Sequence, residues 1–132
     1  MQNQYVVTRE RGIQLIKEAA EDEIIREVSS REELEELIER IPYTRTIQAP
    51  NGRIRKELYQ EAMGKYDDLE WVKIIKSVHL RVEDRNYEPY EPEFLEKAQQ
   101  YLYGELAVVF EIPFHQVEAY LNETITRQLE EF

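Results

Sequence analysis

The chain has 132 residues, no cysteine and a net charge of −11, because 28 Asp and Glu outnumber 17 Lys and Arg. The length suits one domain with a single core, and the missing cysteines exclude disulfides and thiolate catalysis. No apolar run approaches the roughly 20 residues of a membrane span, so we expect a cytoplasmic protein without a membrane partner.

A helix over residues 9–21, with extended flanks, is predicted for the N-terminal piece of residues 1–29. The flanks are residues 5–7 and 24–28, whose apolar and β-branched side chains suit extended chain. The apolar residues at helical spacing are Ile13, Ile16 and Ala20. Short apolar runs of this kind fit strands as well as helices.

Residues 30–52 are predicted to form a connector helix followed by a linker. Ser30 and Glu33 have the spacing of a capping box, in which each side chain accepts a hydrogen bond from the other residue's backbone N–H. Pro42 is expected to end the helix, and residues 50–52 are a strong turn signal at the end of the linker. The apolar stripe of this helix is Leu34, Leu37, Ile38 and Ile41.

Residues 53–132 are predicted to form a compact bundle of four helices, so the expected fold class is all-α. Gly104 lies in the middle of the third helix, where glycine costs up to about 1 kcal/mol relative to alanine. A glycine at this position therefore predicts that another helix crosses close to the backbone of the third helix. The four helices are expected over residues 54–63, from the N-cap Asp67 to residue 83, over 92–110 with Pro92 in the first turn, and after Pro113.

The second of these helices carries the only tryptophan. Its apolar stripe predicts a core position for Trp71, and His79 beside the stripe is expected to be half-buried. Four tyrosines near the loop at residues 86–91 suit either a partner-binding patch or packing of that loop, and we favour packing. The stripe is Trp71, Ile75, Val78 and Val82, and the tyrosines are Tyr87, Tyr90, Tyr101 and Tyr103.

Nothing in the sequence points to catalysis or to a cofactor. There is no glycine-rich phosphate loop, and with 28 acidic residues chance carboxylate pairs are expected. His115 and Glu118 lie three residues apart on one helix, but a metal site in a bundle needs matching ligands from facing helices. We therefore predict no enzyme activity, no metal site and no cofactor.

Residues 57–81 and 94–125 resemble the C-terminal helical domain of the CarD-type bacterial transcription regulators. Residues 24–42 are similar to the connector of that family, so the resemblance covers about residues 24–125. Its most specific elements are residues 97–98, 104–107 and 112–113.

The resemblance implies a regulator that acts at bacterial promoters through DNA and RNA polymerase. In the family, a Tudor-like β-domain binds the polymerase β subunit, and the helical domain contacts promoter DNA at the upstream edge of the melted region. Only 23 residues precede Ile24 here, so at most one strand of that β-domain is expected, which puts the polymerase contact in doubt. The family's wedge tryptophan is absent from residues 51–59, where Ile54 is the apolar candidate for insertion between base steps.

The resemblance also implies a set of DNA contacts in which the cations hold phosphates and position the protein rather than specify sequence. The alternative is an acidic helical module for protein–protein interaction that has lost DNA binding and engages a protein or, as a homo-oligomer, itself. The predicted DNA-binding residues are Arg53, Ile54, Arg55, Lys56, Lys76 and Arg81.

Overall fold

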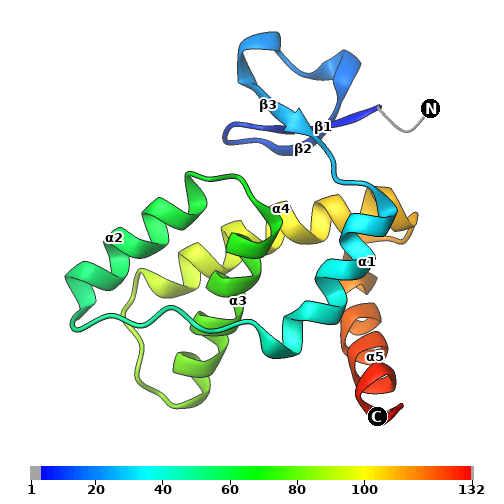
Figure 1. Cartoon of the computed structure of the whole chain (residues 1–132). Coiled ribbons are helices and arrows are strands. Elements are labelled where there is room, and N and C mark those ends of the chain that lie inside the picture. The colour runs from blue at the N-terminus through cyan, green and yellow to red at the C-terminus, as the bar shows by residue number, and fades with distance from the viewer. Residues whose placement is uncertain (1–3, 132) are drawn as a thin grey trace. The chain divides into compact units, whose positions relative to one another are not determined.

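A computed structural model describes residues 4–131 of the chain. In this part, five α-helices and one three-stranded sheet form the regular structure (Figure 1). The chain divides into two compact units: residues up to Pro42 together with those from Tyr103 onward form the first, and residues 43–102 form the second. The protein is mostly helical, as predicted, but a small sheet is added to the helices. None of the helices described has the length and apolar character that a membrane crossing requires.

The sheet belongs to the first unit and is antiparallel throughout. β1 (Tyr5–Thr8) lies in the middle, between β2 (Gly12–Leu15) and β3 (Ile24–Glu27). Val6 and Val7 point to opposite faces of β1, and both are buried. The small sheet is therefore covered on both faces at its central strand.

Two expectations for the N-terminal piece are wrong. In place of a helix over residues 9–21, the chain forms a hairpin turn, β2 and two short 3₁₀ turns, η1 (Ile16–Glu18) and η2 (Glu21–Glu23). Pairing with β1 sets Ile13 opposite Val7, and this tertiary pairing overrides the helical spacing. The expectation of at most one strand is also wrong, because three short strands form here. The predicted extended flanks are confirmed as β1 and β3.

The connector helix, α1 (Arg31–Arg40), begins as predicted. The Glu33 N–H donates to Ser30 Oγ (3.1 Å) and the Ser30 N–H donates to Glu33 Oε1 (2.8 Å), which confirms the capping box. The helix passes into a 3₁₀ turn, η3 (Ile41–Tyr43), that contains Pro42. Its buried residues are Leu34, Leu37 and Ile38.

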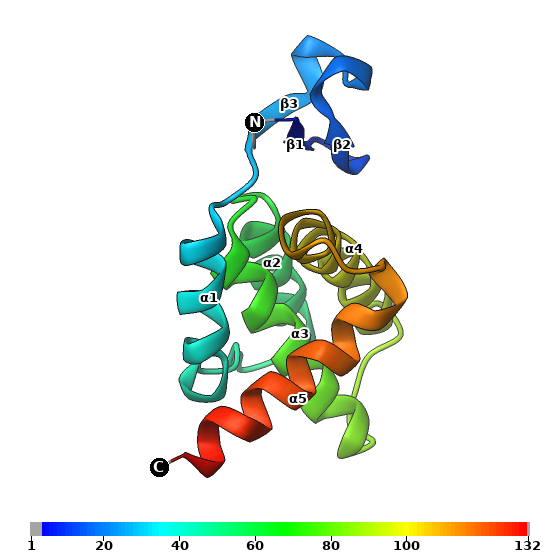
Figure 2. The same ribbon diagram turned by 90° about the vertical axis from the view of Figure 1, so that its right-hand side faces the viewer.

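The C-terminal helix, α5 (Val117–Glu130), packs against α1 within the first unit (Figure 2). A short 3₁₀ turn, η4 (Phe114–Gln116), precedes it, so the predicted break at Pro113 is confirmed. The side chains of Val117 and Leu121 are buried, whereas Leu129 is 46% exposed. The apolar side chains of α5 are thus buried in the core only in the first part of the helix.

The second unit is built from α2 (Gly52–Met63), α3 (Asp68–Glu83) and the first part of α4 (Glu91–Phe110). Asn51 and Asp67 cap α2 and α3 through side-chain oxygens that accept backbone N–H groups two or three residues ahead. The cap at Asp67 was expected, whereas Asn51 starts α2 two residues earlier than predicted. Pro92 lies in the first turn of α4, as predicted.

The core of the second unit is centred on Trp71. Its side chain is fully buried and stacks on Tyr101 with a centroid distance of 5.0 Å, which confirms its core position. The expectation of a half-buried His79 is wrong, because its side chain is exposed. Leu80 and Val82 are also 47% and 39% exposed, so the last turns of α3 extend beyond the core.

Gly104 is close to a strand rather than to a crossing helix. A Cβ atom added at Gly104 would lie 3.0 Å from Cγ1 of Ile13, on β2 of the same unit. The prediction of a close neighbour is therefore confirmed, but the predicted identity of that neighbour is wrong. The neighbour lies on β2, within residues 9–21, for which the sequence predicts a helix.

Candidate functional site

Two segments of the second unit contain cations and no acidic residue. Residues 43–56 and 71–82 hold seven of the chain's 17 Lys and Arg residues and none of its 28 Asp and Glu. We call these two segments the basic surface. Their cations are Arg45, Arg53, Arg55, Lys56, Lys73, Lys76 and Arg81.

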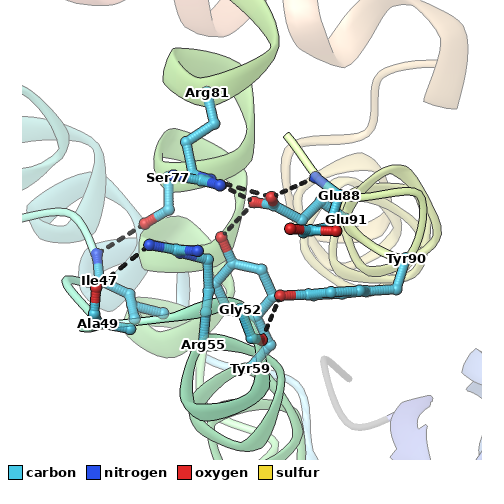
Figure 3. Close-up of polar contacts among 10 residues, drawn as sticks. All are labelled: Ile47, Ala49, Gly52, Arg55, Tyr59, Ser77, Arg81, Glu88, Tyr90 and Glu91. Atoms are coloured by element: carbon cyan, nitrogen blue, oxygen red, sulfur yellow. Dashed lines mark hydrogen bonds and ion pairs between the residues drawn. The ribbon is translucent and has the colours of Figure 1, made fainter. Parts of the chain in front are cut away.

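Hydrogen bonds hold the two segments of the basic surface together (Figure 3). The Ile47 N–H donates to Ser77 Oγ (2.7 Å), and that hydroxyl donates to the Lys73 carbonyl (2.6 Å). Lys76 Nζ donates to the Thr44 carbonyl (2.6 Å), and burial lowers the pKa of this amine. The linker is thereby fixed along α3, although its sequence predicts only a loop.

The start of α2 is also fixed from the α4 side. The Tyr90 hydroxyl donates to the Gly52 carbonyl (2.6 Å), and Lys56 Nζ lies 5.6 Å from the centroid of the Tyr90 ring. This ammonium–ring distance is in the range of a cation–π contact. Burial raises the pKa of the Tyr90 hydroxyl. The first turn of α2 thus has a defined position within its unit.

The six predicted DNA-binding residues differ in how far they reach solvent. Arg53 and Lys56 are exposed, and Arg53 has only a 3.8 Å pair with Glu57 that is itself largely exposed. Ile54 is half-buried, so most of its side chain is not available as a wedge. The structure therefore brings Arg53 and Lys56 to the surface of the first turn of α2.

The other three predicted residues have partners inside the second unit. Arg55 is half-buried and donates from Nη2 to the Ala49 carbonyl (3.2 Å), and Lys76 has the carbonyl partner described above. Arg81 donates from Nε to both carboxylate oxygens of Glu91 (2.9 and 3.0 Å). These three cations stabilise the fold of this unit before any ligand is considered.

Glu91 is a buried carboxylate that sequence reasoning missed. Its side chain is fully buried and also accepts hydrogen bonds from the Tyr59 hydroxyl (2.7 Å) and the Glu88 N–H (2.9 Å) (Figure 3). Burial by itself would raise the pKa of Glu91, but the donors from Glu88, Tyr59 and Arg81 hold it below its ordinary value. Burial and the adjacent carboxylate raise the pKa of Tyr59. A glutamate in a first helical turn is ordinarily an exposed complement to the helix dipole, so no sequence signal marks its burial.

The four tyrosines named from the sequence do not form one exposed patch. Tyr101 is fully buried, Tyr103 nearly so, and Tyr90 half-buried, as packing predicts. Tyr87 is the exception, with 48% of its side chain exposed.

Metal-ligating residues are scattered rather than clustered. Within residues 4–131, no group of three or more His, Asp or Glu side chains is arranged to hold a metal ion. His115 and Glu118 are both exposed, as is His79. The exposed cations of the basic surface are Arg45, Arg53 and Lys56. Compared with protein-family models and with curated proteins, the chain matches none of them.

Proposed function

We propose that the chain is a CarD-like transcription regulator that acts at bacterial promoters through contacts with DNA. The observation that carries the proposal is the pair of exposed cations, Arg53 and Lys56, in a segment of the basic surface whose sequence contains no acidic residue, although the chain has a net charge of −11. Phosphate neutralisation by Lys and Arg supplies most of the affinity in such complexes, and it requires a local rather than an overall excess of positive charge. The resemblance over residues 24–125 supplies the promoter context.

Exposure divides the proposed DNA-binding residues into two roles. Arg53 and Lys56, at the start of α2, contact phosphates, and the exposed Arg45 of the linker is a further candidate contact. The Arg53–Glu57 pair does not prevent the contact, because an exposed pair contributes about 0–1 kcal/mol. Arg55, Lys76 and Arg81 contribute to the positive potential and keep the linker and α3 in place.

The experiment is a binding titration of the full chain with a labelled promoter-length duplex at low salt. We expect the double variant Arg53→Gln/Lys56→Gln to lose about tenfold or more in affinity, since each charged hydrogen bond contributes on the order of 1 kcal/mol. The matched control is Lys97→Gln/Arg127→Gln, which makes the same change in net charge with two exposed residues outside the basic surface. Equal losses in the two double variants, or no binding by the wild type, would contradict the proposal.

RNA polymerase is the second partner in this proposal. β2 and β3 are the two edge strands of the sheet in the first unit, and each edge has backbone groups that another strand can pair with. A pull-down with the polymerase β subunit tests this contact separately from DNA binding. The proposed regulator is cytoplasmic, has no cofactor and is not an enzyme.

The same edge strands favour a second candidate function, an acidic module for protein–protein interaction. In that case β2 or β3 pairs with a partner protein or with another copy of the chain. The mass of the wild-type protein in solution distinguishes pairing with another copy of the chain from pairing with a partner protein, because self-pairing makes the mass depend on concentration. A Pro substitution at Ile25, in the edge strand β3, is then expected to shift the mass toward the monomer.

A further inference from the structure

A polar hollow lies in the second unit, between the two segments of the basic surface. Its volume is about 170 Å³, and the linker, α2 and the C-terminal part of α3 form its walls. Pockets for whole drug-sized ligands begin at about 300 Å³, so this hollow has room for a single small group. Its lining residues are Thr46, Ile47, Gln48, Arg55, Ser77, Leu80, Arg81, Asp84 and Asn86.

Two guanidinium groups, those of Arg55 and Arg81, line this hollow and have N–H donors without a hydrogen-bond partner in the described chain. Arg81 donates to Glu91 through Nε alone, and within residues 4–131 its two Nη groups make no hydrogen bond. Arg55 donates from Nη2 to the Ala49 carbonyl, and no carboxylate of the described chain pairs with it. The guanidinium fork matches the oxygens of phosphate, so two such groups at one hollow favour an oxyanion.

The surrounding residues restrict the side chains of the two arginines before a ligand binds. Arg81 is only 20% exposed, and its bond to the fully buried Glu91 fixes the direction of its guanidinium group. Arg55 is half-buried, so little side-chain entropy remains to be lost when a ligand binds. The side-chain amides of Gln48 and Asn86 add neutral donors to the lining.

We propose that this hollow is a binding site for the phosphate group of a small phosphorylated molecule. This site is distinct from the exposed cations proposed above for DNA, and it does not rest on that proposal. A duplex backbone meets Arg53 and Lys56 first, because they project from the first turn of α2. Arg55 and Arg81 are recessed, so a terminal phosphate on a small molecule reaches them more easily than a continuous backbone does.

Asp84 provides a charge test of the site. It is the only acidic residue that lines the hollow, and it has no ion pair within the described chain. A bound anion is repelled by this exposed carboxylate. Its removal should therefore tighten anion binding without disturbing a buried group.

The test is a titration of the isotope-labelled full chain with inorganic phosphate at constant ionic strength, followed by NMR chemical shifts. We expect saturable shifts at Gln48, Arg55 and Asn86. Arg55→Gln, which keeps one amide donor toward Ala49, should weaken phosphate binding by about tenfold. Asp84→Asn should tighten it by about two- to fivefold, the range expected for one exposed charge. Lys97→Gln, at an exposed residue outside the basic surface, is the matched control and should leave the affinity unchanged, and Arg53→Gln should weaken phosphate binding less than Arg55→Gln does.

Two further titrations, with adenosine monophosphate and with a duplex, identify the source of the phosphate. Adenosine monophosphate should bind at least as tightly as inorganic phosphate, and a duplex should shift residues around Arg53 instead of the hollow. Phosphate shifts that do not saturate, or equal weakening by Arg53→Gln and Arg55→Gln, would overturn the proposal. The proposal would also be overturned if duplex displaced bound phosphate in proportion to the fraction of protein that is bound to duplex. The hollow would then be part of the DNA-binding surface. Loss of duplex binding with saturable phosphate binding retained contradicts only the DNA proposal.

Discussion

Each unit contains one fully buried glutamate paired with an arginine. Glu91 pairs with Arg81 in the second unit, and Glu105 pairs with Arg26 in the first, where Arg26 Nη1 lies 2.9 Å from Glu105 Oε2. The Ser29 N–H also donates to Glu105 Oε2. A buried charge without such partners costs several kcal/mol, so each pair fixes the conformation around it.

The pH dependence of stability should reflect Glu91. Its pKa in the folded protein is below the ordinary 4.5, so ionised Glu91 stabilises the fold above that value. This contribution is lost as the pH falls below 4.5 and through the lowered pKa of the folded state. We expect denaturant unfolding to show a smaller acid-dependent loss of stability for Glu91→Gln than for the wild type. An identical acid branch in both proteins would show that Glu91 is not the group responsible.

Loss of the arginine partner alone should be more damaging to stability than loss of the arginine and the carboxylate together. Arg26→Met removes the ion pair between Arg26 and Glu105 and keeps the hydrogen bond from the Ser29 N–H to Glu105. Removal of one partner of a buried pair costs about 3–5 kcal/mol, whereas the double variant Arg26→Met/Glu105→Met removes the buried carboxylate as well. Chemical denaturation should therefore rank the double variant above the single one in stability. The reverse order would mean that burial of Glu105 is not the source of the cost.

Elements whose signals are local were predictable from the sequence, and the others were not. The capping box of α1, the cap at Asp67 and the break at Pro113 each depend on neighbouring residues, and all three are confirmed. The strand β2 depends on pairing with β1, and the helical spacing of Ile13, Ile16 and Ala20 concealed it. The linker position depends on Lys76 and Ser77, two residues about 30 positions away in the chain.

The cap of α1 should contribute measurably to stability. Ser30→Ala removes the side-chain oxygen that accepts the Glu33 N–H, and we expect a loss of about 1 kcal/mol in the free energy of unfolding. Ser30→Asp keeps an acceptor at the same position and should lose much less. Urea unfolding of the three proteins checks this order, and equal stability for all three would contradict it.

The β1–β2 hairpin requires glycine at one position. Gly12 has φ 81°, a conformation that side chains with Cβ atoms rarely adopt, so Gly12→Ala should destabilise the protein by about 1 kcal/mol. Gly64 has φ −69°, and a Cβ there would meet only ordinary contacts. Gly64→Ala is therefore the control, with an expected effect near zero or slightly stabilising. A thermal unfolding comparison that shows no difference between the two variants would contradict the assignment of β2.

For the proposed binding of DNA by the whole molecule, the distribution of charge matters more than the total charge. The sequence already identified the cations at the start of α2 and along α3 as predicted DNA contacts. It did not reveal that Arg55, Lys76 and Arg81 are engaged within the fold, because each partner is distant in sequence or is a backbone carbonyl. Of the six predicted residues, exposure leaves Arg53 and Lys56 as the proposed phosphate contacts, and the exposed Arg45 is added to them.

The most direct measurement is the salt dependence of duplex binding by the wild type and by Arg53→Gln/Lys56→Gln. For B-DNA, the slope of log affinity against log salt is about −0.9 for each phosphate neutralised. The account predicts a negative slope for the wild type and a slope shallower by about two for the double variant. The Lys97→Gln/Arg127→Gln control should keep the wild-type slope. An unchanged slope in Arg53→Gln/Lys56→Gln, or no duplex binding at the lowest salt, would contradict the proposed regulator.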